Sequence, residues 1–100
     1  MDRSKVLTLI SQSYTQDDIG QQVPVETRKD VFCNITSVSA SEFFDAGQAG
    51  FKPEFRATMF VYDYSGESIA ELEGVRYSVY RTYLGRNETI ELYLERKAGI

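Results

Sequence analysis

The side chains that most often perform catalysis are scarce in this chain, which contains no His and a single Cys, Cys33. Nucleophilic catalysis of the Ser-His or Cys-His kind is therefore excluded, and the usual zinc ligand sets cannot be assembled. The neighbouring carboxylates of Asp17 and Asp18 resemble solvated turn residues more than an acid/base pair. The glycines form neither a P-loop nor a dinucleotide-binding fingerprint. We expect a protein that is not an enzyme and that binds neither a metal nor a cofactor.

Cys33 shares the apolar side of an alternating run with Val31 and Ile35. A reactive Cys needs a neighbouring cation or His that stabilises its thiolate, so we predict a small buried core thiol instead. A single Cys cannot form an internal disulfide. The opening residues lack the long apolar run of a signal peptide, and we therefore expect synthesis in the cytoplasm.

Length and charge narrow the choice of partners. One hundred residues, 42% of them hydrophobic, suit one domain covering residues 1–100, since such a chain buries roughly 60 to 65% of its unfolded surface. Eleven basic and fifteen acidic residues give a net charge of −4, whereas a phosphate-binding surface needs clustered Lys and Arg. No apolar stretch approaches the roughly 20 residues that cross a bilayer. Sequence-specific binding of nucleic acid and insertion into a membrane are not expected.

The elements that would position these side chains are mostly strands, and residues 74–97 have the pattern of a long β-hairpin. Apolar residues alternate with polar ones from residue 90 to residue 95, which is typical of a strand with one buried face. Residues 85–88 contain the Gly and Asn that a tight reversal favours. Using them as the loop predicts a core face made of these pairs: Tyr83 with Ile90, Arg81 with Leu92, Val79 with Leu94, and Tyr77 with Arg96. On the other face, Tyr80 would meet Tyr93.

Arg81 carries a charge on this predicted core face. A buried guanidinium needs a carboxylate partner that offsets its desolvation. Alternatively, the stem covers apolar surface while the head reaches solvent or an acid. A third reading is an ion pair across a boundary between subunits, which would make Arg81 a contact residue.

We predict three further strands, at residues 5–14, 27–38 and 55–62. These stretches either are rich in β-branched or aromatic residues or alternate in side-chain type with period two. Both faces of the third are rather apolar, which indicates either burial on both sides or contact with a partner. Residues 69–73 read as a short connection into the hairpin. These patterns predict an all-β fold, a small antiparallel β-barrel or sandwich of about five to six strands, with one short helix in a long loop.

Two loops interrupt this pattern, at residues 15–24 and 39–53. The first is rich in Asp, Gly and Pro, which favour turns. In the second, Ser39 and Glu42 have the spacing of a capping box, in which each side chain takes up a free amide of the first helical turn. We expect a helix of one or two turns over residues 42–46, ended by the glycines that follow.

Five short segments, spread through most of the chain, carry a resemblance to a known family. They are DIGQ at 18–21, residues 37–43 with their Glu-Phe pair, GFKPE at 50–54, YSVYRTY at 77–83 and IELY at 90–93. In order, spacing and total length, the chain resembles the small bacteriophage head-tail joining proteins, also called head-closure, stopper or head-tail adaptor proteins. The resemblance implies a non-enzymatic virion component with a small β-barrel core.

In this family the protein is made in the cytoplasm of the bacterial host and lies in the head-tail connector, or neck, of a tailed phage or prophage. The resemblance implies a ring, dodecameric on its template and monomeric in isolation, between the portal and adaptor ring and the tail proteins. The ring closes the portal channel after DNA packaging and provides the surface on which the tail docks. A long loop that looks like residues 39–53 would reach the ring axis, although its predicted helix shortens that reach.

Carried over by position, the expected contact residues fall in the two loops and the hairpin. They are Asp17, Asp18, Ile19, Gln21, Glu42, Phe43, Phe44, Asp45, Gln48, Lys52 and Arg81. For Phe43 and Phe44 the alternative is that at least one packs the helix onto the barrel.

A second function also fits a small barrel. Single-stranded nucleic acid binds to exposed aromatic rings on such folds, and Tyr80, Tyr83 and Tyr93 could supply those rings. The net negative charge disfavours this alternative.

Overall fold

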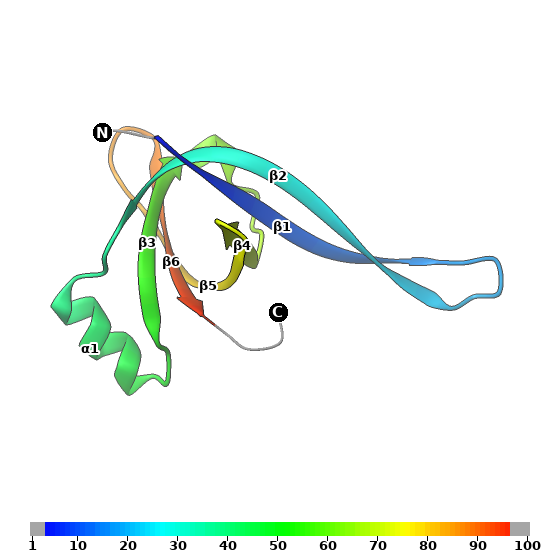
Figure 1. Ribbon diagram of the computed structural model, residues 1–100, viewed down its shortest axis with the longest axis horizontal. Coiled ribbons are helices and arrows are strands. Elements are labelled where there is room, and N and C mark those ends of the chain that lie inside the picture. Colours follow the sequence, from blue (N-terminus) through cyan, green and yellow to red (C-terminus); the bar gives the residue numbers. More distant parts are fainter. Residues whose placement is uncertain (1–3, 97–100) are drawn as a thin grey trace.

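The computed structural model describes residues 4–96, which form a closed antiparallel barrel with one helix packed outside it (Figure 1). Around the barrel the strand order is β1-β2-β3-β6-β5-β4. The elements, in chain order, are β1 (Lys5–Gln16), β2 (Gln22–Thr36), α1 (Ala40–Gln48), β3 (Pro53–Phe60), the 3₁₀ turn η1 (Val61–Asp63), β4 (Ile69–Leu72), β5 (Val75–Leu84) and β6 (Thr89–Arg96). The prediction of a mainly β fold with a small antiparallel barrel is confirmed.

The core follows from the alternation of apolar residues along the strands, which places every second side chain inside the barrel. Leu7, Leu9, Leu92 and Leu94 are fully buried there. Cys33 is fully buried among them, as predicted. Burial raises the pKa of its thiol from 9.0 to about 11, so the thiol remains protonated and unreactive at neutral pH.

β4 corrects the prediction for residues 69–73, because the expected connection is a strand that closes the barrel. It pairs with β1 on one side and with β5 on the other. The loop into β5 has only two residues, Glu73 and Gly74, between the paired Leu72 and Val75. Both have positive φ, at 52° and 81°, which is the conformation that two-residue hairpin loops require. The closure removes a free edge that a five-stranded sheet would have left open.

The hairpin of β5 and β6 forms, but its register changes halfway. The pairs of Tyr77 with Arg96 and of Val79 with Leu94 are confirmed. A bulge between Val79 and Arg81 then shifts the pairing by one residue, so Arg81 lies opposite Tyr93 rather than Leu92. The core-face positions predicted for Arg81 and Tyr83 are therefore wrong: both are exposed, Tyr83 by 61%. The inserted residue moves every later side chain to the other face.

β1 and β2 extend together far beyond the barrel. β1 pairs with β4 through Thr8–Ile10, and β2 pairs with β3 through Asn34–Thr36. Past these contacts the two strands pair with each other alone, out to Gln16 and Gln22. We call residues 11–27 the arm. It gives the molecule its length, with extents of 50 × 30 × 23 Å, and it projects at one end of the long axis (Figure 1).

The loop predicted at residues 15–24 is wrong in extent, because only residues 17–21 turn. Pro24 misled the prediction, since Pro is usually absent from the interior of a sheet. Here Pro24 lies in β2 opposite Tyr14. The arm has two strands, so each of them is an edge strand, and an edge strand tolerates a residue without an amide donor.

The helix forms within residues 39–53 and is longer than predicted. Ser39 caps it: its hydroxyl oxygen accepts a hydrogen bond from the Glu42 amide, at 3.2 Å. The other hydrogen bond of the predicted capping box does not form, because the Glu42 carboxylate turns toward β5 instead of taking up an amide of the first helical turn. Beyond Gln48 the chain reverses at Gly50, whose φ is 90°, and the Phe51 amide donates to the Ala46 carbonyl. Residues 4–96 contain one α-helix, α1. Its nine residues are too few to span a membrane.

Candidate interaction surfaces

The predicted contact residues gather at two places rather than one. Asp17, Asp18, Ile19 and Gln21 form the tip of the arm. The others lie on or beside α1: Glu42, Phe43, Phe44, Asp45, Gln48, Lys52 and Arg81. Figure 1 shows the arm and α1 at opposite ends of the long axis. The molecule therefore has two separate candidate surfaces.

Hydrogen bonds fix the turn at the arm tip. The Asp17 carboxylate accepts from the amides of Ile19 and Gln21, at 3.0 and 2.8 Å. The Asp17 amide donates to the Gln21 carbonyl at 2.9 Å, and Gly20 provides the positive φ of 84°. Asp17 therefore has a structural role in the turn. Ile19 is held outward, with 77% of its surface exposed, and Asp18 is exposed beside it.

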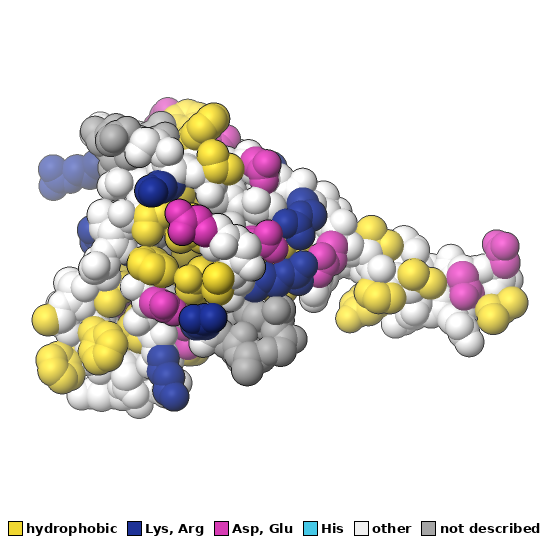
Figure 2. Space-filling model, viewed as in Figure 1, with side chains coloured by type: hydrophobic (Ala, Val, Ile, Leu, Met, Phe, Trp, Pro, Cys, Tyr) yellow, Lys and Arg dark blue, Asp and Glu magenta, His cyan; other side chains and the backbone are white. Residues whose placement is uncertain are grey.

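Apolar side chains lie on both faces of the arm. Val23 and Val25 lie opposite Thr15 and Ser13 on one face, and Tyr14 lies opposite Pro24 on the other. Tyr14, Val23 and Val25 are all exposed. Figure 2 shows hydrophobic side chains along the projecting arm and acidic ones at its end. No Lys or Arg occurs in the arm.

Sequence reasoning missed the contribution of Tyr14, Val23 and Val25, because the predicted strands end at residue 14 and resume only at residue 27, so the pairing of residues 11–16 with residues 22–27 was not expected. The available signal was the run of Val23, Pro24 and Val25 in a segment with few charges. Exposed apolar residues in such number on a ribbon without its own core indicate a contact surface.

A cluster of charged side chains ties the base of the arm to the barrel. The Arg76 guanidinium on β5 donates two hydrogen bonds to the Glu26 carboxylate, at 2.9 and 3.0 Å. Arg76 also lies 3.5 Å from Glu71, which pairs with Arg28 at 2.9 Å. The hydrogen bonds from Arg76, and then from Gln12, lower the pKa of Glu26. We call this group the arm clamp.

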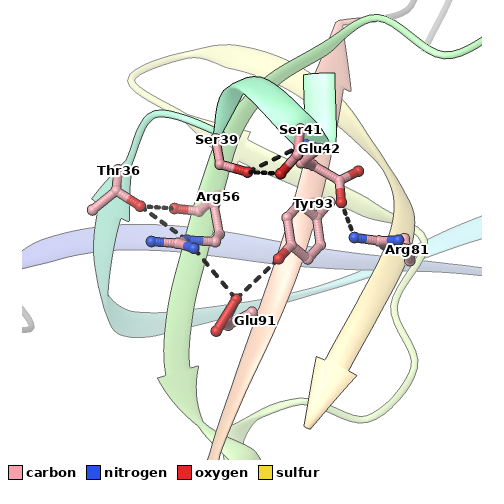
Figure 3. A network of polar contacts seen from close by, with 8 residues as sticks. All are labelled: Thr36, Ser39, Ser41, Glu42, Arg56, Arg81, Glu91 and Tyr93. Atoms are coloured by element: carbon pink, nitrogen blue, oxygen red, sulfur yellow. Dashed lines mark hydrogen bonds and ion pairs between the residues drawn. The ribbon is translucent and has the colours of Figure 1, made fainter. Parts of the chain in front are cut away.

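At the other end, Glu42 holds α1 against the barrel. Its carboxylate is buried and accepts a hydrogen bond from the Tyr80 hydroxyl, at 3.0 Å. It also accepts a hydrogen bond from Arg81 (Figure 3). The Arg81 guanidinium also lies over the Tyr93 ring, 4.6 Å from its centre. Of the three interpretations of Arg81, the structure shows the second: the guanidinium is half exposed and pairs with an acid, Glu42, of its own chain.

Aromatic rings complete the floor below α1. Phe51 stacks on Tyr80 with ring centres 4.8 Å apart and an angle of 18°. Burial, followed by the neighbouring Tyr93 and Glu95, raises the pKa of Tyr80, so its hydroxyl stays a hydrogen-bond donor. Tyr93 in turn donates to Glu91 at 3.0 Å (Figure 3). The ring of Tyr93 is thus held beneath the helix.

A small pocket opens between α1 and β5. It has a volume of about 140 Å³. Its walls are formed by Glu42, Asp45, Ala46, Ala49, Phe51, Tyr80 and Arg81. Lys52, directly after Phe51, is exposed, while its amide donates to Glu95 at 3.0 Å. We call the pocket together with Phe43, Phe44 and Lys52 the helix surface.

Phe43 and Phe44 do not pack the helix onto the barrel, so that alternative is wrong. They are 54% and 69% exposed, with their rings edge to face at 6.3 Å. Glu42 and Ala46 are the buried helix residues. Gln48, in the last turn, is exposed. α1 therefore contacts the barrel through a polar anchor and turns apolar rings outward.

These surfaces offer groups that suit binding to another protein: apolar side chains at both ends, acids at the arm tip, and a guanidinium beside the pocket. Residues 4–96 contain no group of three or more Cys, Asp or Glu residues placed to hold a metal ion. No protein-family model matches the chain, and no curated protein shows a significant match to it.

Proposed function

We propose that this protein is a structural subunit of the head-tail connector of a tailed bacteriophage or prophage. In this role it forms a ring in the neck, closes the portal channel after DNA packaging and provides a docking surface for the tail. The arm is the observation that carries the proposal. A separate argument is the resemblance of the sequence, over most of its length, to head-tail joining proteins.

The arm supports an assembling role because it gains little by folding alone. An isolated two-stranded ribbon is only marginally stable in water, and the arm pairs with no other strand among the described residues. It nevertheless keeps Tyr14, Ile19, Val23 and Val25 on its surface. Contact with a neighbouring subunit would bury these side chains, at a gain of roughly 25 cal/mol for each Å² of apolar area.

The charge distribution supports a protein that surrounds DNA without gripping it. The net charge is −4. Several basic side chains already have carboxylate partners within 4.0 Å, namely Arg28, Lys29, Arg56, Arg76 and Arg81. A phosphate backbone would have to compete with these partners for the guanidinium and ammonium groups.

The alternative, a binding module for single-stranded nucleic acid, receives less support. It requires aromatic rings open to bases, but Tyr93 is only 8% exposed and Tyr80 is stacked under Phe51. Of the three rings considered, Tyr83 remains on the surface.

The direct test is binding to the connector. The chain is mixed with its cognate portal and adaptor proteins, and sedimentation and electron microscopy follow whether it joins them as a ring. We expect a ring on the adaptor. Failure to join the complex contradicts the proposal, whereas a monomer in the absence of portal and adaptor is expected.

A titration with single-stranded oligonucleotides at low salt tests the alternative. We expect no binding. A micromolar affinity that falls as salt is added would favour the nucleic-acid module over the connector.

A further inference from the structure

We propose that the arm of one subunit docks on the helix surface of the next copy, with Ile19 entering the pocket between α1 and β5. This inference rests on the proposed function, because it names the contact that would join subunits within the ring. The two surfaces belong to one chain but lie at opposite ends of its long axis (Figure 1). The arm therefore reaches away from the pocket of its own chain.

Shape is the first argument for a second copy as the occupant. Ile19 lies at the tip of the arm, on a turn fixed by Asp17. Its apolar side chain is therefore held in one position and projects from the turn. The pocket has about 140 Å³, and an apolar cavity of about 150 Å³ can hold a group the size of benzene. An Ile side chain therefore fits the available space, and Phe51, Ala46 and Ala49 provide apolar walls.

Charge is the second argument. The tip carries two acids and the arm carries no base. Beside the pocket lie the half-exposed guanidinium of Arg81 and the exposed Lys52. Two acids also line the pocket: Glu42 is already bonded to Arg81 and Tyr80, and Asp45 is exposed. Because Asp17 is engaged within its turn, Asp18 is the acid free to meet Lys52.

Symmetry is the third argument. A contact between two different surfaces of the same chain is heterologous, so each subunit can accept one neighbour and offer its arm to another. Such contacts form a ring when the rotation between successive subunits closes, and an open filament when it does not. An arm that met only another arm would instead form a two-fold dimer and stop.

Disulfide trapping tests the contact. One variant carries Ile19→Cys and a mass tag, and the second carries Ala49→Cys in the pocket wall. Native Cys33 is fully buried and gives little background. Under mild oxidation of an equimolar mixture, we expect the ratio of mixed dimer to homodimers to exceed its statistical value by about tenfold, which corresponds to about 1.4 kcal/mol. The control replaces Ala49→Cys by Arg86→Cys, an exposed position in the turn between β5 and β6, outside the arm and the helix surface, and should give the statistical ratio.

A charge exchange checks the orientation. Asp18→Lys in the tagged variant should lower the ratio of mixed dimer to homodimers by about threefold, as expected of an exposed ion pair. Lys52→Glu in the second variant should restore it. An excess of either homodimer over the mixed dimer would overturn the head-to-tail contact in favour of a two-fold one.

The trapping is performed on the chain alone and on the complex with portal and adaptor. A mixed-dimer excess in either sample supports the arm contact. If the wild-type chain binds the connector but neither sample gives an excess, the arm contact is wrong and the proposed function stands. If the wild-type chain fails to bind while trapping succeeds, the proposed function is wrong and self-docking stands.

Discussion

β1 and β2 run through both the barrel and the arm, yet their side chains meet opposite surroundings in the two regions. In the barrel, Leu7 and Leu9 of β1 are fully buried, and Val31 and Cys33 of β2 complete that layer. Further along the same strands, Tyr14, Val23 and Val25 are exposed. The backbone pairing is continuous from one region to the other. Local β pairing therefore does not require a core, and the exposed part of the ribbon is available for contacts outside the chain.

The largest expected difference between the two regions is in their response to truncation. Leu92→Ala should lower the free energy of unfolding by about 2 to 5 kcal/mol, because it leaves a cavity in the closed barrel. Ile19→Ala should change it by less than about 0.5 kcal/mol, because Ile19 is exposed. Denaturant unfolding of both variants measures the contrast. A comparable loss in the two variants would mean that the arm tip contributes to the fold of the single chain.

The anchor of α1 should have an intermediate effect. Glu42→Ala removes the acceptor of the Tyr80 and Arg81 hydrogen bonds, and we expect a loss of about 1 to 2 kcal/mol, since Arg81 remains partly solvated. Amide hydrogen exchange within α1 should accelerate more than exchange in the barrel. Gln48→Ala, on the exposed side of the same helix, is the control and should leave both quantities nearly unchanged. Unchanged exchange in Glu42→Ala would show that other contacts hold the helix.

The smallest expected effect is at the arm clamp. Arg76→Gln removes the two hydrogen bonds to Glu26, so we expect faster amide exchange at the base of the arm and little change in global unfolding. The native contact favours the charged form of Glu26 and lowers its pKa from the ordinary value of 4.5. The clamp should therefore be complete above pH 4.5 and should weaken as the pH falls below that value.

Amide hydrogen exchange at the base of the arm, measured from pH 7 downward and corrected for the pH dependence of intrinsic exchange, checks this prediction. The wild-type arm base should approach the Arg76→Gln variant at low pH. If the two still differ as strongly at pH 3 as at pH 7, Glu26 does not govern the clamp.

Much of the barrel could be predicted from sequence because its strands alternate apolar and polar residues in the ordinary way. The burial of Cys33, the strand at residues 90–95 and the capping Ser39 all followed from local patterns. The bulge beside Tyr80 could not be found in this way, since one inserted residue leaves no composition signal while it moves Arg81 and Tyr83 to the other face.

The arm was missed for a different reason. Asp17, Asp18, Gly20 and Pro24 each favour a turn, and together they suggested a loop of ten residues. Only the turn at residues 17–21 is real, because the unpaired outer edges of the arm accept Pro24. The predicted contact residues at the tip are exposed as expected, but the apolar flanks that accompany them become visible only once the strands are known.

The most direct measurement of the central claim is amide hydrogen exchange of the arm, residues 11–27, in the free chain and in the chain bound to portal and adaptor. The account predicts rapid exchange in the free arm and strong protection after assembly, together with protection of α1. Bound chains whose arm exchanges as fast as in the free state would contradict the account, because the ring would then be held by other surfaces.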